Sequence, residues 1–178
     1  MKNADQGFVV WLTGFSGSGK STIARKLHEE LKRRGLKVES FDGDEVRRNL
    51  SKGLGFSKED RDTHNKRIIY VAKLLTRNGV NTIVSLISPY RSTRAYGREN
   101  LPRFVEVYLK CSIEECIKRD PKGLYKKALA GEIKDMTGIQ DPYEEPLNPE
   151  LTLDTEHRSS NHNLQKLLTK LKELNYIS

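Results

Sequence analysis

Residues 14–22 constrain this chain more than any other stretch. They read Gly-Phe-Ser-Gly-Ser-Gly-Lys-Ser-Thr and match G-x-x-x-x-G-K-[ST], the pattern of a phosphate-binding loop (P-loop). The apolar run at 8–13 before the loop predicts a buried strand. Apolar residues at helical spacing follow the loop, so it opens onto a helix N-terminus, which favours anions. A strand, loop and helix in this order indicate a nucleotide site, whereas a chance Gly/Ser-rich turn needs no such flanks.

Each residue type in the loop has a chemical reason to be there. The glycines permit a tight turn and let backbone amides face the phosphates. Lys20 is expected to reach the β- and γ-phosphates of ATP, and Ser21 to ligate Mg²⁺. The predicted nucleotide-binding residues are Gly14, Ser16, Gly17, Ser18, Gly19, Lys20, Ser21 and Thr22.

Composition sets broad limits on the kind of protein. The 178 residues suit a single domain, and 32 Lys and Arg against 24 Asp and Glu give a net charge of +8. Such a surplus suits polyanionic ligands such as nucleotides, and no basic block indicates nucleic acid. No run is long enough to span a membrane, and the cysteines, Cys111 and Cys116, fit reduced packing residues. We therefore expect a cytoplasmic protein that binds neither a membrane nor nucleic acid.

Alternating strand-like and helix-like segments predict the fold. Strands are expected at 8–13, 36–41, 80–87, 104–109 and 151–154. Helices are expected between them at 20–35, 45–50, 57–78, 91–100 and 112–119, with a last helix starting at Ser159 or Ser160. Strands that alternate with helices form a parallel sheet with right-handed crossovers. The prediction is an α/β P-loop kinase fold, with a five-stranded parallel sheet flanked by helices.

Two acidic residues follow the second predicted strand. Asp42 and Asp44 fall at the carboxyl end of that strand, where ligands of such sheets bind, on the same side as the P-loop. Paired carboxylates there can hold Mg²⁺ through water and orient an attacking hydroxyl. Asp-Gly is also an ordinary turn dipeptide, but the position beside the P-loop favours function.

The segment after these acids combines basic residues with one aromatic ring. Arg47 lies on the short helix, and Arg61 lies near the start of the helix capped by Ser57. Phe56, on the loop between the two helices, either stacks on a base or anchors the loop in the core, and the sequence leaves both open.

Residues 120–149 show little periodicity and are rich in Lys, Gly, Pro and Tyr. A segment this long without regular structure in a compact domain is typical of a lid. Its basic residues Lys122, Lys126 and Lys127 either meet phosphates or form an exposed basic loop.

The P-loop alone does not identify a reaction. Asn65-Lys66-Arg67 is followed by Ile68, so the guanine-reading N-K-x-D of Ras-type GTPases is missing. The third strand runs into Ser88 rather than into the acid that motor ATPases place there. With the acids after the second strand, a small-molecule phosphotransferase fits better.

Six further segments resemble the adenylylsulfate kinase family, in order and over nearly the whole chain. They are Asp42-Gly43-Asp44 with Arg47, Gly53-Leu54-Gly55-Phe56-Ser57, Asp60-Arg61, Ile87-Ser88-Pro89-Tyr90-Arg91, Asp120-Pro121-Lys122-Gly123-Leu124-Tyr125-Lys126-Lys127-Ala128, and Thr137-Gly138-Ile139 with Asp141-Pro142-Tyr143-Glu144. The resemblance implies transfer of the ATP γ-phosphate to the 3′-hydroxyl of adenylylsulfate (APS), giving 3′-phosphoadenylylsulfate and ADP. It also implies sulfate activation, Mg²⁺ dependence, a homodimer and functional coupling to an ATP sulfurylase on a separate chain.

The resemblance also implies roles for individual residues. The catalytic set it implies is Lys20, Asp42, Asp44 and Ser88, the last matching a serine described in the family as a phosphorylated intermediate. The substrate-binding set is Asp42, Asp44, Arg47, Phe56, Arg61, His64, Ile87, Ser88, Pro89, Tyr90, Lys122, Leu124 and Met136. Ser21 is expected to hold Mg²⁺ directly, and either Asp42 or Asp44 through water.

The chain departs from the family pattern on the substrate side. His64 stands where the family has an Asn that contacts substrate, and Lys66 replaces an Arg. Met136 stands where the family usually has a Phe that faces the ring matched by Phe56 across the substrate adenine. Because a thioether recovers less stacking energy than a ring, Met136 is expected to weaken adenylylsulfate binding.

Two other functions compete with this interpretation. The first is a P-loop kinase that acts on another small hydroxyl compound, such as a nucleoside. Activity assays with a panel of substrates distinguish it, because only an adenylylsulfate kinase requires the sulfate-bearing nucleotide. A nucleic-acid-binding protein would show binding with a steep salt dependence.

Overall fold

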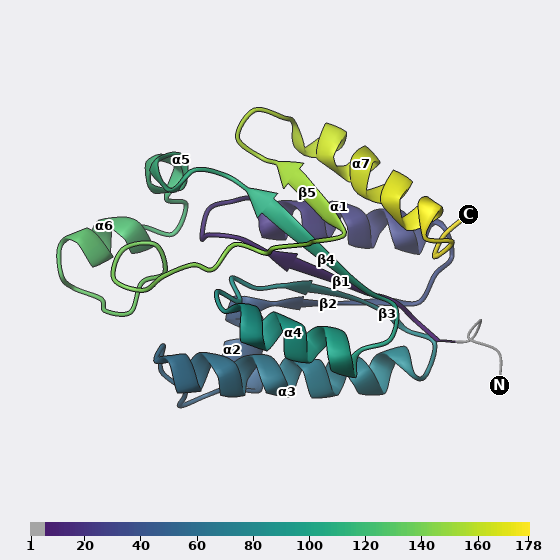
Figure 1. Cartoon of the computed structure of the whole chain (residues 1–178), viewed down its shortest axis with the longest axis horizontal. Coiled ribbons are helices and arrows are strands. Elements are labelled where there is room, and N and C mark those ends of the chain that lie inside the picture. Colours follow the sequence, from purple (N-terminus) through teal and green to yellow (C-terminus); the bar gives the residue numbers. More distant parts are fainter. Residues whose placement is uncertain (1–5) are drawn as a thin grey trace.

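A five-stranded parallel sheet forms the centre of the computed structural model, which describes residues 6–178 (Figure 1). Its strand order is β2-β3-β1-β4-β5. The strands are β1 (Val9–Thr13), β2 (Val38–Asp42), β3 (Asn81–Ser85), β4 (Phe104–Lys110) and β5 (Leu151–Asp154). The predicted fold class is confirmed.

The central strand β1 carries the P-loop at its carboxyl end. It pairs in parallel with β3 on one side and β4 on the other, with Val9 in register with both Thr82 and Phe104. All five of its residues are buried, as expected for a strand covered by helices on both faces. The start of the phosphate loop is therefore fixed by the most enclosed element of the fold.

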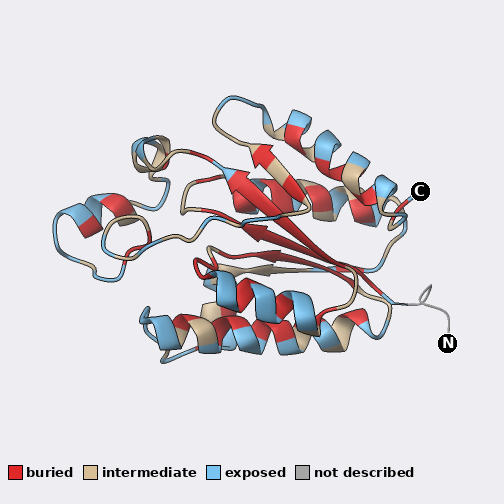
Figure 2. Ribbon diagram, in the orientation of Figure 1, coloured by how far each residue is buried: buried red, intermediate tan, exposed pale blue. Residues whose placement is uncertain are grey.

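Helices cover both faces of the sheet (Figure 1). The helices are α1 (Lys20–Arg33), α2 (Gly43–Asn49), α3 (Lys58–Thr76), α4 (Arg91–Asn100), α5 (Ile113–Arg119), α6 (Leu124–Leu129) and α7 (Ser160–Glu173). On one face α1 and α7 pack with β-strand side chains in a core that includes Leu27 and Leu171. On the other face lie α2, α3 and α4, with Val46 and Ile68 in a second core. Burial follows this layering, because the strands are mostly buried and the helices expose their outer sides (Figure 2).

The strands point toward the end of the molecule where α5 and α6 project, and the C-terminus lies at the opposite end (Figure 1). A third, smaller apolar cluster, which we call the lid cluster, fills this projection. Its buried members are Cys111, Cys116, Tyr125, Ala128 and Met136, with Phe15 of the P-loop packed against them. The projection therefore has a core of its own beyond the carboxyl edge of the sheet.

Helix α6 corrects the prediction that 120–149 lacks regular structure. It spans six residues, too few for a helical period to be detected. Its start is fixed by Asp120, whose carboxylate accepts hydrogen bonds from the backbone N–H groups of Tyr125 and Lys126. The burial of Tyr125 then holds the helix against the lid cluster, which is a tertiary contact that local sequence does not reveal.

Several element boundaries also differ from those expected. Strand β2 runs to Asp42, and α2 begins at once with Gly43, because the Asp42 carboxylate caps the helix by accepting from the Asp44 N–H. Strand β3 ends at Ser85, two residues before the predicted boundary. No helix within residues 6–178 is long and apolar enough to cross a bilayer.

Candidate active site

Two glycines of the P-loop occupy positions that a larger residue could not. A side chain would collide with a neighbouring strand at Gly14 and would strain the backbone at Gly19. At Gly14, φ is +153° and a Cβ would lie 2.8 Å from the carbonyl oxygen of Leu109 on β4. Gly19 has φ +90°, a conformation that residues with a side chain rarely adopt, and the space around its Cβ position is open. These two glycines therefore allow the loop to turn between β1 and α1.

The N-terminus of α1 is suited to an anion. Its N-cap is Gly19, which has no side chain to accept from the first-turn amides, and the turn that follows contains no acidic residue. By contrast α2, α3, α5 and α7 are capped by the side chains of Asp42, Ser57, Ser112 and Ser159. Phosphate oxygens can satisfy the unpaired amides of α1, and the helix dipole favours their charge.

Lys20 is buried within the loop. Its ammonium donates to the carbonyl oxygens of Gly14 at 2.9 Å and Phe15 at 2.6 Å. Burial lowers the pKa of Lys20 to about 8. An anionic phosphate group beside the ammonium would oppose that effect and favour the charged form.

Asp42 lies next to the P-loop and is held in place by two contacts. The Ser21 hydroxyl donates to Asp42 Oδ2 at 2.9 Å, and the Asp44 N–H donates to Oδ1 at 3.1 Å. A hydroxyl beside a carboxylate suits Mg²⁺, which takes one or two protein oxygens and completes its shell with water and phosphate. No group of three or more His, Cys, Asp and Glu side chains able to hold a metal occurs in the described part of the chain.

Asp44 faces the projecting segment instead. It forms an ion pair with Lys122, and both side chains are about half exposed. Lys122 lies two residues before Leu124, the first residue of α6. The Tyr125 hydroxyl on the same helix donates to the Ser16 carbonyl oxygen of the P-loop at 2.9 Å. The 120–149 segment therefore contacts both the phosphate loop and the acid pair.

Phe56 is an exposed ring between two arginines. The guanidinium carbons of Arg47 and Arg61 lie 4.3 Å and 5.5 Å from its centroid. Its residue surface is 51% exposed, so the alternative of a core anchor does not fit. Arg61 is buried and also donates to the carbonyl oxygens of Phe56 and Asp135, which connects this corner to the middle of the 120–149 segment.

His64 is buried one turn along α3 from Arg61. Its Nδ1 shares a hydrogen bond of 2.8 Å with the Ser51 hydroxyl. Burial, together with the nearby charges of Arg47 and Arg67, lowers the pKa of His64 to about 4. The side chain is therefore a neutral imidazole at physiological pH.

Ser88 belongs to residues 87–90, which we call the substrate turn. Its side chain is buried, and its hydroxyl accepts a 3.0 Å hydrogen bond from the indole Nε1 of Trp11. Its φ of +40° lies in the left-handed region that residues with a side chain rarely adopt. Ile87 on the same turn accepts a 2.7 Å hydrogen bond from the Thr13 hydroxyl. The hydroxyl of Ser88 is thus engaged within the fold.

Met136 lies in the lid cluster with its side chain buried, beside Tyr125 and Cys116. Its contact with the substrate adenine stays a prediction. Cys116 is a free thiol whose pKa is raised to about 12 by burial and by a hydrogen bond with Cys111, so it is an inert packing residue here.

Sequence reasoning missed Trp11, Arg94 and Tyr143. The Tyr143 hydroxyl hydrogen-bonds that of Thr13 at 2.8 Å, and Arg94 is a buried arginine behind the substrate turn. Arg94 could have been found as a charged residue on the buried face of the helix at 91–100. That helix has so few apolar residues that its buried face cannot be recognised from the sequence.

Comparison with known proteins gives a consistent result. The model of the adenylylsulphate kinase family matches residues 6–154. A probable adenylyl-sulfate kinase of Pyrococcus abyssi is 52% identical over 172 residues, which are 97% of this chain and 99% of that protein. A probable bifunctional SAT/APS kinase of Sorangium cellulosum is 57% identical over 96% of this chain, and the match spans 29% of that protein's length.

A solved structure resembles the whole described architecture. The Mycobacterium tuberculosis APS kinase CysC, determined in complex with AMPPNP and APS, superimposes with a TM-score of 0.90 at 40% identity. The match covers 94% of this chain and 98% of that one.

The buried neutral His64 generates a pH prediction. Its pKa rises from about 4 in the folded state to the ordinary 6.5 on unfolding, so the unfolded chain binds more protons between these values. Its contribution to stability is complete above about pH 6.5 and is lost as the pH falls toward 4. The shift corresponds to up to about 3 kcal/mol.

Urea denaturation of wild type and His64→Asn at pH 7, 5.5 and 4 measures this contribution. The stability of wild type relative to His64→Asn should fall by up to about 3 kcal/mol from pH 7 to pH 4, since Asn does not titrate. The exposed His162, replaced by Asn, serves as control and should follow wild type. An equal pH dependence in wild type and His64→Asn would contradict a neutral buried imidazole.

Proposed function

The chain belongs to the adenylylsulphate kinase family, and we propose that Lys20, Asp42 and Asp44 are the side chains on which its reaction depends. The reaction transfers the γ-phosphate of ATP to the 3′-hydroxyl of adenylylsulfate and gives 3′-phosphoadenylylsulfate and ADP. The observation that carries the assignment of residues is that the P-loop and the acid pair meet, through the 2.9 Å bond between Ser21 and Asp42.

The donor half of the proposed site is the P-loop. Its backbone amides and the N-terminus of α1 receive the ATP phosphates, and Lys20 exchanges its carbonyl partners for phosphate oxygens. Ser21 would hold Mg²⁺ directly and Asp42 would hold it through water. When bound, the ion supplies neutralisation of the charge on the β- and γ-phosphates.

The contacts of the two acids support different roles for them. Both oxygens of Asp42 are already engaged, by Ser21 and by the backbone of Asp44, which suits a fixed ligand for the metal's water. Within residues 6–178, Asp44 has the flexible Lys122 as its single ion-pair partner and can turn to the 3′-hydroxyl. In this scheme the hydroxyl oxygen attacks the γ-phosphorus, the bond to the bridging oxygen of ADP breaks, and Asp44 orients the hydroxyl and accepts its proton.

The acceptor half of the proposed site surrounds Phe56. Its exposed ring is available to stack on the substrate adenine, with Arg47 and Arg61 beside it to meet negative charge. The remaining proposed contacts come from both sides of the cleft: His64, Ile87, Ser88, Pro89, Tyr90, Lys122, Leu124 and Met136.

We propose that Ser88 positions the substrate turn and carries no phosphate. A phosphoserine intermediate would require its hydroxyl to leave the Trp11 indole and reach the γ-phosphate from a buried position. Direct in-line transfer needs no such intermediate.

The Tyr125–Ser16 and Lys122–Asp44 contacts support the proposal that 120–149 closes over bound nucleotides. Three buried members of the lid cluster, Tyr125, Ala128 and Met136, belong to this segment, so its movement would shift them against Cys111, Cys116 and Phe15.

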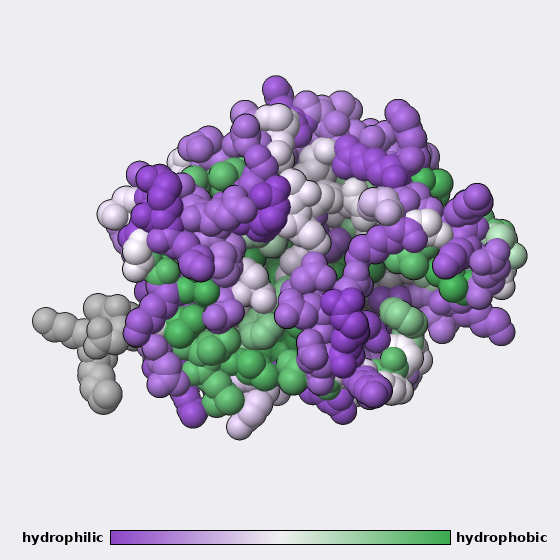
Figure 3. Space-filling view, turned by 180° about the vertical axis from the view of Figure 1, so that it is seen from behind, coloured by the Kyte–Doolittle hydropathy of each residue, from purple (hydrophilic) through white to green (hydrophobic). Residues whose placement is uncertain are grey.

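We also propose that the chain forms a homodimer. In support, Leu50 and Tyr70 are large exposed side chains beside an open hollow of about 470 Å³, which is lined by residues of α3 and by Leu50 just after α2. Apolar surface is also gathered on the face seen from behind (Figure 3). Light scattering of wild type and Tyr70→Glu tests this, and a monomeric wild type would refute it.

A cytoplasmic location is proposed because free buried thiols at Cys111 and Cys116 suit a reducing compartment. Cell fractionation tests it, and recovery outside the cytoplasmic fraction would refute it.

Supply of adenylylsulfate by an ATP sulfurylase on a separate chain is proposed as well. Added sulfurylase, ATP and sulfate should then replace added adenylylsulfate in the assay, and failure to do so would refute it.

The primary test is ADP release from ATP with and without adenylylsulfate. We expect release to require adenylylsulfate and to fall to background in Lys20→Ala, because that variant loses the charge over the transferred phosphate. Circular dichroism should show an intact fold, and the exposed Lys118→Ala is the matched control. A folded Lys20→Ala with near wild-type turnover would refute the assignment.

The acid pair and Ser88 are separated by three variants. Asp42→Asn and Asp44→Asn should each lose at least about tenfold to a hundredfold in turnover. Ser88→Ala should keep substantial turnover but lose about 1–3 kcal/mol of stability, because the Trp11 indole is left unpaired. Inactivity of a folded Ser88→Ala, together with isolation of a chemically competent phosphoserine, would instead favour a covalent route.

Limited trypsin digestion tests the lid. Cleavage in the free protein is expected after the exposed Lys126, Lys127 and Lys134, and ADP plus adenylylsulfate should suppress it. Equal cleavage rates with and without the nucleotides would exclude closure of this segment.

A further inference from the structure

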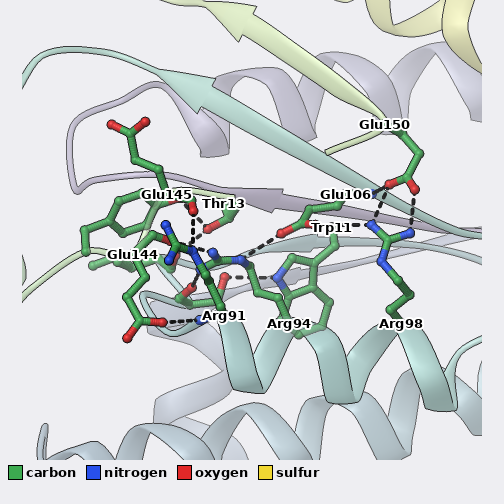
Figure 4. Close-up of polar contacts among 12 residues, drawn as sticks. Trp11, Thr13, Arg91, Arg94, Arg98, Glu106, Glu144, Glu145 and Glu150 are labelled. Atoms are coloured by element: carbon green, nitrogen blue, oxygen red, sulfur yellow. Dashed lines mark hydrogen bonds and ion pairs between the residues drawn. The ribbon is translucent and has the colours of Figure 1, made fainter. Parts of the chain in front are cut away.

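Arg94, on α4, joins three segments that are far apart in the sequence (Figure 4). Its side chain is 2% exposed. The guanidinium donates through Nε to Glu106 Oε1 on β4 at 2.7 Å. Its Nη1 donates to the Ser88 carbonyl oxygen and its Nη2 to that of Glu144. A planar fork of this kind fixes its partners in direction as well as in distance.

The charge of Arg94 is balanced by a row of alternating charges (Figure 4). Glu106 also pairs with Arg98 at 3.1 Å, and Arg98 pairs in turn with Glu150. Glu150 accepts the backbone N–H of Glu106 at 2.7 Å, so the row is tied to β4. A buried pair of this kind adds little net stability compared with apolar packing, but breaking it leaves an uncompensated charge. Its value lies in fixing geometry.

Arg94 stabilises the unusual backbone conformation of Ser88. A residue with a side chain in the left-handed region costs on the order of 1–2 kcal/mol and persists where its surroundings fix it. Ser88, with φ +40°, is fixed from both ends: Arg94 binds its carbonyl oxygen and Trp11 binds its hydroxyl. The conformation of the substrate turn therefore depends on Arg94.

Glu144 belongs to residues 141–145, the end of the lid segment, which we call the lid arm. Beyond Arg94, the lid arm is bonded to the turn by a hydrogen bond of 2.8 Å from the Glu144 N–H to the Pro89 carbonyl oxygen. The Arg91 N–H donates to the Glu144 carboxylate at 2.7 Å. Arg61, beside Phe56, lies 3.9 Å from Asp141 of the same arm.

We propose that Arg94 is a positioning residue for adenylylsulfate: its guanidinium holds the substrate turn and the lid arm together, so that the acceptor side of the cleft is preformed. This inference deepens the proposed function and rests on it. Within residues 6–178 the hydrogen bonds of Arg94 go to β4, the substrate turn and the lid arm, and none goes to the P-loop. Its guanidinium also lies 5.7 Å from the Tyr143 ring of the lid arm, which packs against Phe15 of the P-loop. Donor binding should therefore depend on Arg94 much less than acceptor binding does.

The test compares Arg94→Lys with Arg98→Lys. Lysine keeps the positive charge beside Glu106 but cannot direct three N–H groups at three separated acceptors. We expect Arg94→Lys to raise the KM for adenylylsulfate at least about tenfold, while the KM for ATP and the Kd for ADP change less than about twofold. Arg98 is the matched control, because its contacts within the described residues are Glu106, Glu150 and the Phe104 ring. Arg98→Lys should leave both KM values near wild type.

A purely structural role for Arg94 predicts a different result. Arg94→Lys would then lower the melting temperature without separating the two KM values, and that outcome overturns the proposal. Equal effects of Arg94→Lys and Arg98→Lys on the adenylylsulfate KM also overturn it. If wild type itself does not phosphorylate adenylylsulfate, the proposed function has failed instead, and the two failures are distinguishable.

Hydrogen exchange on the unmodified protein keeps the proposal testable if Arg94→Lys does not fold. The amides of Arg91 and Glu144 each bond across the turn and the arm, so they should open with the same free energy. Both should slow together when adenylylsulfate binds. Free exchange at Glu144 while Arg91 stays protected would show that the arm opens without the turn, which overturns the proposal.

Discussion

The carboxyl edge of the parallel sheet is the constraint on which the rest of this structure depends. Because every strand ends on the same side, the P-loop after β1, the acids after β2, the substrate turn after β3 and the lid after β4 must all meet there. Complete burial of β1 between two helical layers fixes where the phosphate loop starts. The topology of the sheet alone therefore places the proposed donor and acceptor sites at the same carboxyl edge.

Local patterns were enough to predict the parts of the site that are continuous in sequence. The P-loop with its flanking strand and helix, and Asp42 and Asp44 at the carboxyl end of β2, needed only spacing and strand order. The Ser88–Trp11 and Arg94–Glu144 contacts were beyond reach, because they join residues 77 and 50 positions apart and depend on how strands pair. Helix α6 was missed for the same reason, since tertiary packing of Tyr125 stabilises it rather than its own periodicity.

Buried polar contacts divide the labour at the active edge. On the donor side, the bonds of the Lys20 ammonium to other described residues go to two carbonyl oxygens, which it can exchange for phosphate. Behind the acceptor side the buried polar contacts are many: Arg94, Glu106, Trp11 and Glu144 fix one strained serine and the turn that contains it. This contrast agrees with the proposed roles of the two sides. The P-loop adapts to the polyphosphate of ATP, whereas the substrate turn must hold adenylylsulfate with its 3′-hydroxyl in line with the γ-phosphate.

The role of Ser88 distinguishes direct transfer from a covalent mechanism. In direct transfer Ser88 is a buried residue that supports the substrate turn, and in the covalent mechanism it carries the phosphate. The most direct measurement is the stereochemical course at phosphorus, using ATP made chiral at the γ-position with oxygen isotopes and sulfur. A single in-line transfer to the 3′-hydroxyl inverts the configuration of the transferred group, and inversion is the result predicted here. Retention of configuration would require two successive displacements through an enzyme-bound phosphate and would contradict the account.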